Sequence, residues 1–198
     1  MTSPEEVLGF WLDRVGPKGW YDTSEAWDSE IRTAFTSAYE NACEGTFSLW
    51  LTYPSGTLAY LILMDQFPRN MFRDDPRAFA ADRHALAAAK AAIHQGWDMR
   101  ISEPARQFFY LPLMHSENLC DQDRCVRLIL ERMPETGASN LLHARAHRDV
   151  IRQFGRFPHR NAVLGRASSR AEAEFLASGG YGATVRRLQA ADPEMVSA

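Results

Sequence analysis

The chain has 198 residues, of which 45% are hydrophobic and 24% are charged. This balance is typical of a folded globular protein and argues against wholesale disorder. The length suits one domain with a sizeable core, and we predict a single domain over residues 1–198. The formal net charge is only −3, so the overall charge favours neither nucleic acid nor a membrane surface as a partner.

Targeting signals are not evident. The first residues lack a basic stretch followed by an apolar run, which a secretory signal would require. The longest apolar run, LAYLILM at residues 58–64, is far too short to cross a membrane. The three cysteines are an odd number without Cys-x-x-Cys spacing, which is typical of reduced thiols. We therefore expect a cytoplasmic protein.

Helix signals follow one another along the chain. Ser3, Pro4 and Glu6 form a capping box at the start of the first helix. A Ser/Thr cap precedes a second helix, which Gly45 ends. The stretch YPSGTLAYLILMDQF (53–67) is apolar nearly all round, and its length and lack of alternation favour a centrally buried helix over a strand.

The clearest helix is predicted over residues 75–96, with Asp75 as its cap, Pro76 at its first position and Gly96 at its end. Further helices are predicted over residues 102–115, where Pro112 interrupts, and over 116–134, 138–156 and 168–180. We expect an all-α fold of about eight or nine helices packed as antiparallel hairpins. Residues 181–198 are expected to form a poorly ordered tail.

Positive charge is concentrated near the C-terminal end. Between His143 and Arg170 there are seven arginines and one acidic residue, Asp149. Such a local positive potential favours an anionic ligand or an internal acidic partner. The arginines surround a Phe-Pro step in RFPHRN (156–161), and QFPRN (66–70) repeats this pattern.

Both Phe-Pro steps are expected at helix ends. Proline disfavours the α conformation in the preceding phenylalanine and can begin a new short helix. Each phenylalanine would then anchor a corner in the core, and the arginine and asparagine would project from a helical turn. Asp65 follows an apolar run and needs a cation. We predict that Asp65 pairs with Arg69 and with Arg156 or Arg160, and so bridges the two corners.

Histidines offer other chemistry. His115 lies directly after a strongly apolar run, and Ser116 and Glu117 suit the start of the next helix. His143 and His147 are one helical turn apart, a spacing that metal ligands use. The sequence contains no HExxH motif, and the nearby arginines disfavour a dication, so we expect neither a metal site nor a cofactor.

Three segments resemble a known family: LAYLILMDQFPRNMFRDDPRAFAAD (58–82), FFYLPLMHSE (108–117) and HRDVIRQFGRFPHRNAVLGRASS (147–169). They are similar to the bacterial family catalogued as domain of unknown function 924, and the likeness runs nearly to residue 177. The resemblance implies a right-handed, tetratricopeptide-like superhelix and no established activity. The positions that match the family signature are Asp65, Gln66, Arg69, Asn70, His115, Glu117, His147, Arg156, His159, Arg160, Asn161 and Arg166.

Three functions remain open from the sequence. The leading hypothesis is a ligand-binding module for a small molecule or a peptide terminus that carries a carboxylate or phosphate. Its expected ligand-binding residues are Asp65, Arg69, Asn70, His115, Arg156, His159, Arg160 and Asn161. The second is an acid/base hydrolase or lyase, with catalytic candidates His115, Glu117, His147 and Asp65. The third is a structural scaffold with a closed network of ion pairs.

Overall fold

The structure is a computed structural model that describes residues 2–192. It confirms the all-α fold, and no strand occurs within those residues. The chain divides into two compact units, Met1–Pro112 (unit 1) and Leu113–Ala198 (unit 2), and each is described by itself. The single domain and the tetratricopeptide-like superhelix stay predictions.

Unit 1 is built around one buried helix. Its α-helices are α1 (Pro4–Leu8), α2 (Gly16–Gly19), α3 (Glu25–Cys43), α4 (Pro54–Leu61), α5 (Phe67–Met71) and α6 (Asp82–His94). Helix α4 contacts both α1 and α6. Every residue from Gly56 to Phe67 is buried, which confirms the central helix predicted from the apolar run.

The first Phe-Pro step differs from its prediction. The chain does not turn extended at Phe67, which keeps helical φ and ψ of −59° and −38°. The helix instead widens into a π-helical segment, Ile62–Gln66, and the Phe67 N–H donates to the carbonyl of Ile62. This wider turn lets the chain continue helically into α5 in spite of Pro68.

Short turns replace helix in two other predicted segments of unit 1. The predicted helix 75–96 is split into a 3-10 turn, Pro76–Phe79, and α6. Asp75 does cap the turn, since its side chain accepts from the Arg77 N–H. The segment after Ser102 forms another 3-10 turn, Ala105–Phe109, followed by the short α7 (Leu111–Met114) at the end of the unit.

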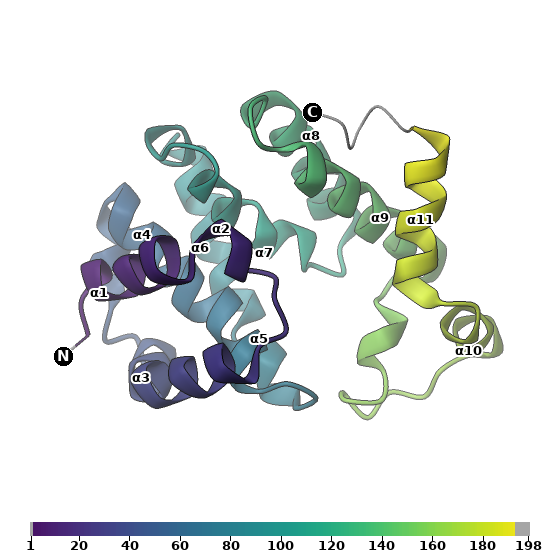
Figure 1. The fold of residues 1–198 in the computed structure, drawn as a ribbon, viewed down its shortest axis with the longest axis horizontal. Coiled ribbons are helices and arrows are strands. Elements are labelled where there is room, and N and C mark those ends of the chain that lie inside the picture. The colour runs from purple at the N-terminus through teal and green to yellow at the C-terminus, as the bar shows by residue number, and fades with distance from the viewer. Residues whose placement is uncertain (1, 193–198) are drawn as a thin grey trace. The chain divides into compact units, whose positions relative to one another are not determined.

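Unit 2 is a helical hairpin with one further helix packed on it. Helices α8 (Leu119–Arg132) and α9 (Ala138–Phe154) pack along each other, and α11 (Gly180–Ala191) packs on α9 (Figure 1). Helix α9 ends at Gly155, whose φ of 70° a residue with a side chain rarely adopts. Helix α10 (Arg170–Ala177) begins with a capping box of Ser169 and Glu172.

Two sequence predictions need correction here. Ser116 does not cap α8, because Asn118 accepts the N–H groups of Cys120 and Asp121 instead. The expected poorly ordered tail forms α11 up to Ala191, and the part of that prediction on residues 193–198 lies outside the described residues. Helix α11 packs on α9, and its Tyr181 lies against the buried cluster of Val150, Ile151 and Phe157.

The stability of unit 1 is expected to depend on one buried carboxylate, that of Asp28. Asp28 is 2% exposed, and it binds the guanidinium of Arg73 and accepts from Asn70 Nδ2 at 2.8 Å. We expect Asp28→Ala to lower the free energy of unfolding by about 2–4 kcal/mol, since both donors lose a desolvated partner. The exposed Asp13→Ala is the control and should change it by less than about 0.5 kcal/mol. Urea unfolding of both variants measures this, and equal losses would contradict the assignment.

Candidate functional site

The predicted acidic residue of unit 1 is buried and paired. Asp65 is 1% exposed, and its carboxylate lies 3.3 Å from Arg69 Nη1. Arg69 Nη2 donates to Asp82 Oδ2 at 3.1 Å. The Asp65–Arg69 pair confirms one half of the predicted bridge. The other half joins residues of different units and stays a prediction.

The second residue of that corner is also held by its own unit. Asn70 donates to Asp28, so its side chain fastens α5 to α3. Within unit 1 this side chain makes a contact between two helices, and the expectation that Asn70 binds a ligand stays a prediction. Arg69 thus joins the carboxylates of Asp65 and Asp82, and Asn70 belongs to a separate group with Asp28 and Arg73.

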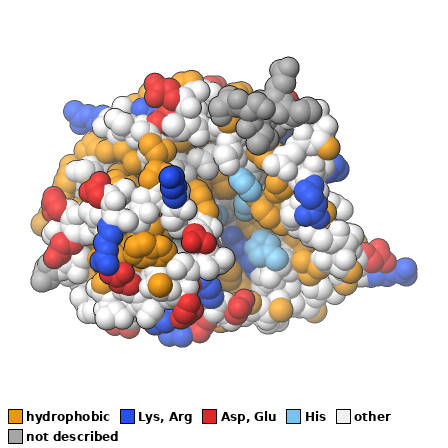
Figure 2. All heavy atoms as spheres, viewed as in Figure 1, with side chains coloured by type: hydrophobic (Ala, Val, Ile, Leu, Met, Phe, Trp, Pro, Cys, Tyr) orange, Lys and Arg blue, Asp and Glu red, His pale blue; other side chains and the backbone are white. Residues whose placement is uncertain are grey.

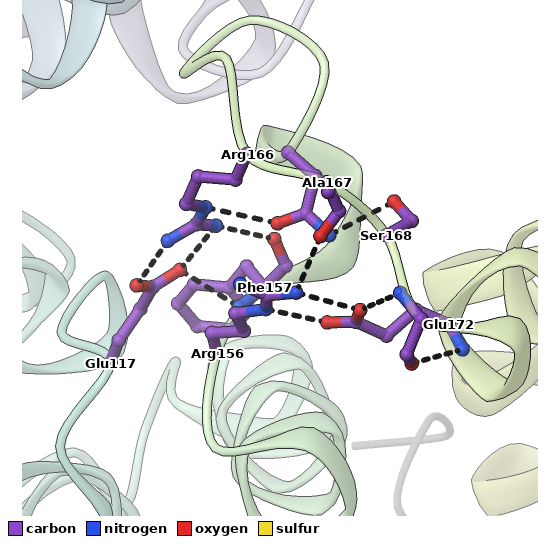
Figure 3. A network of polar contacts seen from close by, with 9 residues as sticks. Glu117, Arg156, Phe157, Arg166, Ala167, Ser168 and Glu172 are labelled. Carbon is purple, nitrogen blue, oxygen red and sulfur yellow. Dashed lines mark hydrogen bonds and ion pairs between the residues drawn. The ribbon is translucent and has the colours of Figure 1, made fainter.

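Unit 2 holds its Phe-Pro corner through one carboxylate (Figure 3). The Phe157 N–H donates to Glu117 Oε1 at 2.8 Å, and Arg166 donates to Glu117 at 2.7 and 3.0 Å. Arg166 Nη2 also donates to the Phe157 carbonyl at 3.0 Å. We call these three residues the Phe157 clamp. Both backbone polar groups of Phe157 are thereby satisfied, and its ring is fixed in the core at 1% exposure.

The clamp also sets the ionisation of Glu117. Partial burial opposes the charged form, but the hydrogen bonds from Arg166 and the Phe157 N–H outweigh it and lower the pKa of Glu117 below its usual 4.5. A carboxylate in this state is a hydrogen-bond acceptor and not a proton donor near neutral pH. Glu117, one of the four catalytic candidates, is therefore poorly suited to act as a general acid.

A second ion pair closes the loop after the corner (Figure 3). Arg156 donates to Glu172 at 2.6 and 2.8 Å and to the Ala167 carbonyl at 2.9 Å. Glu172 also accepts the Ser169 N–H as part of the α10 capping box. Hydrogen bonding to Arg156 and Ser169 lowers the pKa of Glu172. Arg156 thus ties the loop to α10.

Asn161 belongs to the same framework. The residue is 1% exposed, its Oδ1 accepts from Arg166 Nε at 2.9 Å, and its Nδ2 donates to Ser168. All of these polar atoms are used inside unit 2. Arg156, Asn161 and Arg166 therefore shape the corner, and the expected contact of Arg156 and Asn161 with a ligand stays a prediction.

Four histidines of unit 2, His115, His143, His147 and His159, form what we call the histidine cluster. The rings of His147 and His159 lie 5.4 and 5.6 Å from the Phe157 ring, and His115 lies 6.4 Å from His147. The Arg160 guanidinium stacks on Phe157 at 4.5 Å. Figure 2 shows histidine side chains that reach the surface on the face drawn there.

His147 is held neutral with a defined tautomer. Its Nδ1 lies 2.8 Å from the backbone carbonyl of His143, so Nδ1 carries the proton and Nε2 a lone pair. Burial, reinforced by the charges of His115, His143 and Arg160, lowers its pKa to about 3. Within residues 2–192, nothing hydrogen-bonds this Nε2.

Tyr181 is the residue that the sequence analysis missed. Its hydroxyl lies 2.5 Å from His143 Nδ1, and its ring centre lies 4.6 Å from that of His147. Burial raises the pKa of Tyr181 and lowers that of His143. Both groups are therefore neutral near pH 7. Tyr181 lies in the segment 181–198, which the sequence analysis expected to be poorly ordered. Its role could have been predicted only if a helix had been predicted after Gly179.

His159 is exposed, but it lies in a positive environment. Partial desolvation is the main cause that lowers its pKa, and the charge of Arg160 adds to it. Arg160 itself is 6% exposed. His147 and His159 therefore both experience positive potential from the same side chain.

The described residues hold no metal-ligand group, and one cavity lies apart from the histidine cluster. In the part of the chain that the structure describes, no three His, Cys, Asp or Glu side chains are grouped to hold a metal ion. No helix within residues 2–192 is long and apolar enough to span a bilayer.

A cavity of about 210 Å³ lies between α9, α10 and α11, and the 2.9 Å ion pair of Asp149 and Arg187 lies at its wall.

The fold and the site define an all-α protein with a clamped Phe-Pro corner and a histidine cluster in which His143 and His147 are held neutral. The chain belongs to the family described as "Bacterial protein of unknown function (DUF924)", which matches residues 7–180. It is similar to a solved protein of unknown function from Agrobacterium tumefaciens, with 36% identity and a TM-score of 0.81. That alignment covers 87% of this chain and 96% of the other. A comparison with curated proteins gave no match.

The clamp gives a pH-dependent stability. Because the pKa of Glu117 is lowered by folding, its contribution is complete above pH 4.5 and is lost as the pH falls below that value. We expect Glu117→Gln to lower the free energy of unfolding by about 2 kcal/mol at pH 7. The difference from the unmodified protein should shrink as the pH falls below 4.5.

Thermal unfolding between pH 3 and 7 measures the Glu117 effect. The matched control is Glu174→Gln, which removes an exposed pair with Arg170 and should cost under about 0.5 kcal/mol at every pH. A Glu117→Gln protein as stable as the unmodified one at pH 7 would rule out the clamp.

Proposed function

We propose that unit 2 is a binding module for a small anion, a molecule or peptide terminus that carries a phosphate or carboxylate. The histidine cluster is its contact surface. The proposal is supported above all by His147, whose ring is fixed by a backbone hydrogen bond at one edge and leaves Nε2 without a protein partner among the described residues.

Electrostatics supports an anion at this surface. The charge of Arg160 lowers the pKa of both His147 and His159, and that of His115 acts in the same direction on each. An anion beside these rings would experience the same potential with the opposite sign and would be attracted. Of the nearby carboxylates, Glu172 binds Arg156 and Glu117 binds Arg166. Glu117 raises the pKa of His159, but burial and the charges of Arg160 and Arg166 outweigh it.

Two alternatives remain, and the structure bears on each. The closed pairs of Arg156 and Arg166 suit a scaffold, and we assign these residues that role inside the module. An acid/base enzyme needs a base whose pKa lies near the working pH. With a pKa of about 3, His147 of the ligand-free protein is a weak base, so binding is favoured over proton abstraction.

Mass action offers a test of the binding module. A ligand present at about twenty times its Kd adds about 1.8 kcal/mol of stability, which raises the Tm of a small domain by several degrees. We expect inorganic phosphate to raise the Tm of the unmodified protein in this way. His147→Phe keeps an aromatic ring beside Phe157 and Tyr181 but removes both nitrogens, so its Tm should rise much less.

The control variant removes one positive charge of unit 2 that lies away from the histidine cluster. Arg187→Ala removes a cation of unit 2 at the separate cavity, and its phosphate response should equal that of the unmodified protein. Each shift is taken relative to the same variant without phosphate. If His147→Phe responds like the unmodified protein while Arg187→Ala does not, the histidine cluster is not the site.

A further inference from the structure

We infer that the histidine cluster selects an oxyanion that still carries a proton, such as a hydrogen phosphate group, over a fully ionised one. Helix α9 presents one N–H donor, on His143, and one lone-pair acceptor, on His147. This inference rests on the proposed function, since it names the chemistry of the ligand at the same surface.

The donor is set by Tyr181. A phenol O–H is a better donor than an imidazole N–H, and an imidazole nitrogen is a better acceptor than a phenol oxygen. The 2.5 Å contact between the Tyr181 hydroxyl and His143 Nδ1 is therefore an O–H···N hydrogen bond. A neutral His143 whose Nδ1 accepts must carry its proton on Nε2. His143 Nε2–H is thus a fixed donor.

The acceptor is set by the backbone. A carbonyl oxygen can only accept, so the 2.8 Å contact with the His143 carbonyl requires a proton on His147 Nδ1. The remaining nitrogen, Nε2, then carries a lone pair. The two histidines take opposite tautomers because one is oriented by a hydroxyl and the other by a carbonyl.

Donor and acceptor lie on the same face of one helix. Residues four apart on a helix are neighbours, and both rings also pack against Tyr181, at centroid distances of 6.0 Å for His143 and 4.6 Å for His147. Among the described residues, neither Nε2 has another partner. A group that reaches both Nε2 atoms, and that can both accept and donate, would match this pair.

Hydrogen phosphate matches this pair. One P–O⁻ oxygen can accept from His143 Nε2–H, and the P–O–H group can donate to His147 Nε2. A sulfate or a carboxylate has no proton near neutral pH, so its lone pairs would face the lone pair of His147. Protonation of His147 would remove that conflict, but burial and the neighbouring cations oppose it and hold the pKa at about 3.

Phosphate and sulfate, which have the same tetrahedral shape, test whether the histidine cluster selects a protonated oxyanion. Inorganic phosphate keeps at least one proton at pH 7, whereas sulfate has none. We expect calorimetric titration of the full chain at pH 7 to give a Kd for phosphate at least about tenfold below that for sulfate, the factor that one hydrogen bond supplies. His147→Phe should abolish this ratio. Tyr181→Phe should weaken phosphate binding several-fold, because His143 is then free to change tautomer.

Long-range ¹H–¹⁵N NMR of the unmodified protein, recorded without any ligand, determines the tautomers of His143 and His147. We expect the Nε2–H form for His143 and the Nδ1–H form for His147. The opposite form at either histidine would overturn the inference whatever the titrations show.

The titrations separate the two claims. Correct tautomers with equal Kd values for phosphate and sulfate would overturn the selectivity and leave the anion-binding module in place. If neither anion binds, both the module and its selectivity are wrong. Phosphate binding that Arg187→Ala abolishes and His147→Phe leaves intact would move the site to the separate cavity and overturn the inference.

Discussion

The geometry of unit 2 depends on one ion pair, Glu117 with Arg166, that binds both backbone polar groups of a single residue. Glu117 accepts the Phe157 N–H and binds Arg166, and Arg166 returns a hydrogen bond to the Phe157 carbonyl. A residue fixed at its N–H and its C=O cannot rotate about its backbone without losing charged hydrogen bonds. The Phe157 ring therefore stays in place, and the rings of His147 and His159 rest on it.

This arrangement explains the crowding of arginines at the corner. Seven arginines in a short segment would repel one another if all were solvent-facing or all lined a pocket. Arg156 and Arg166 are instead neutralised by Glu172 and Glu117, which lie outside the basic segment on either side. Arg156 and Arg166 thus hold the loop and the corner in place, and in the proposed module the contact with a ligand falls to the histidines and Arg160.

Much of the fold could be predicted from local signals. The capping box at Ser3, the buried run over α4 and the Gly155 stop of α9 all act within a few residues, so a sequence pattern reveals them. The Asp65–Arg69 pair was also predictable, because its members are one turn apart. The helical Phe67 was not, since the π-helical segment that accommodates Pro68 depends on packing in unit 1.

The candidate site was predicted only in part, for a similar reason. His147, His159 and Glu117 were found by their residue types, but the partners that define their chemistry are distant in sequence. Glu172 lies 16 residues from Arg156, and Tyr181 lies 38 from His143. Without the tertiary contacts, arginines already paired inside the protein could not be told from arginines open to a ligand.

Amide hydrogen exchange at Phe157 tests the central claim most directly. If Glu117 and Arg166 hold this residue, its amide should exchange only through global or sub-global unfolding in the unmodified protein. In Arg166→Gln the protection of this one amide should fall by a factor of about 10 or more, while amides in the middle of α9 change little. A Phe157 amide that exchanges near its intrinsic rate in the unmodified protein would contradict the account.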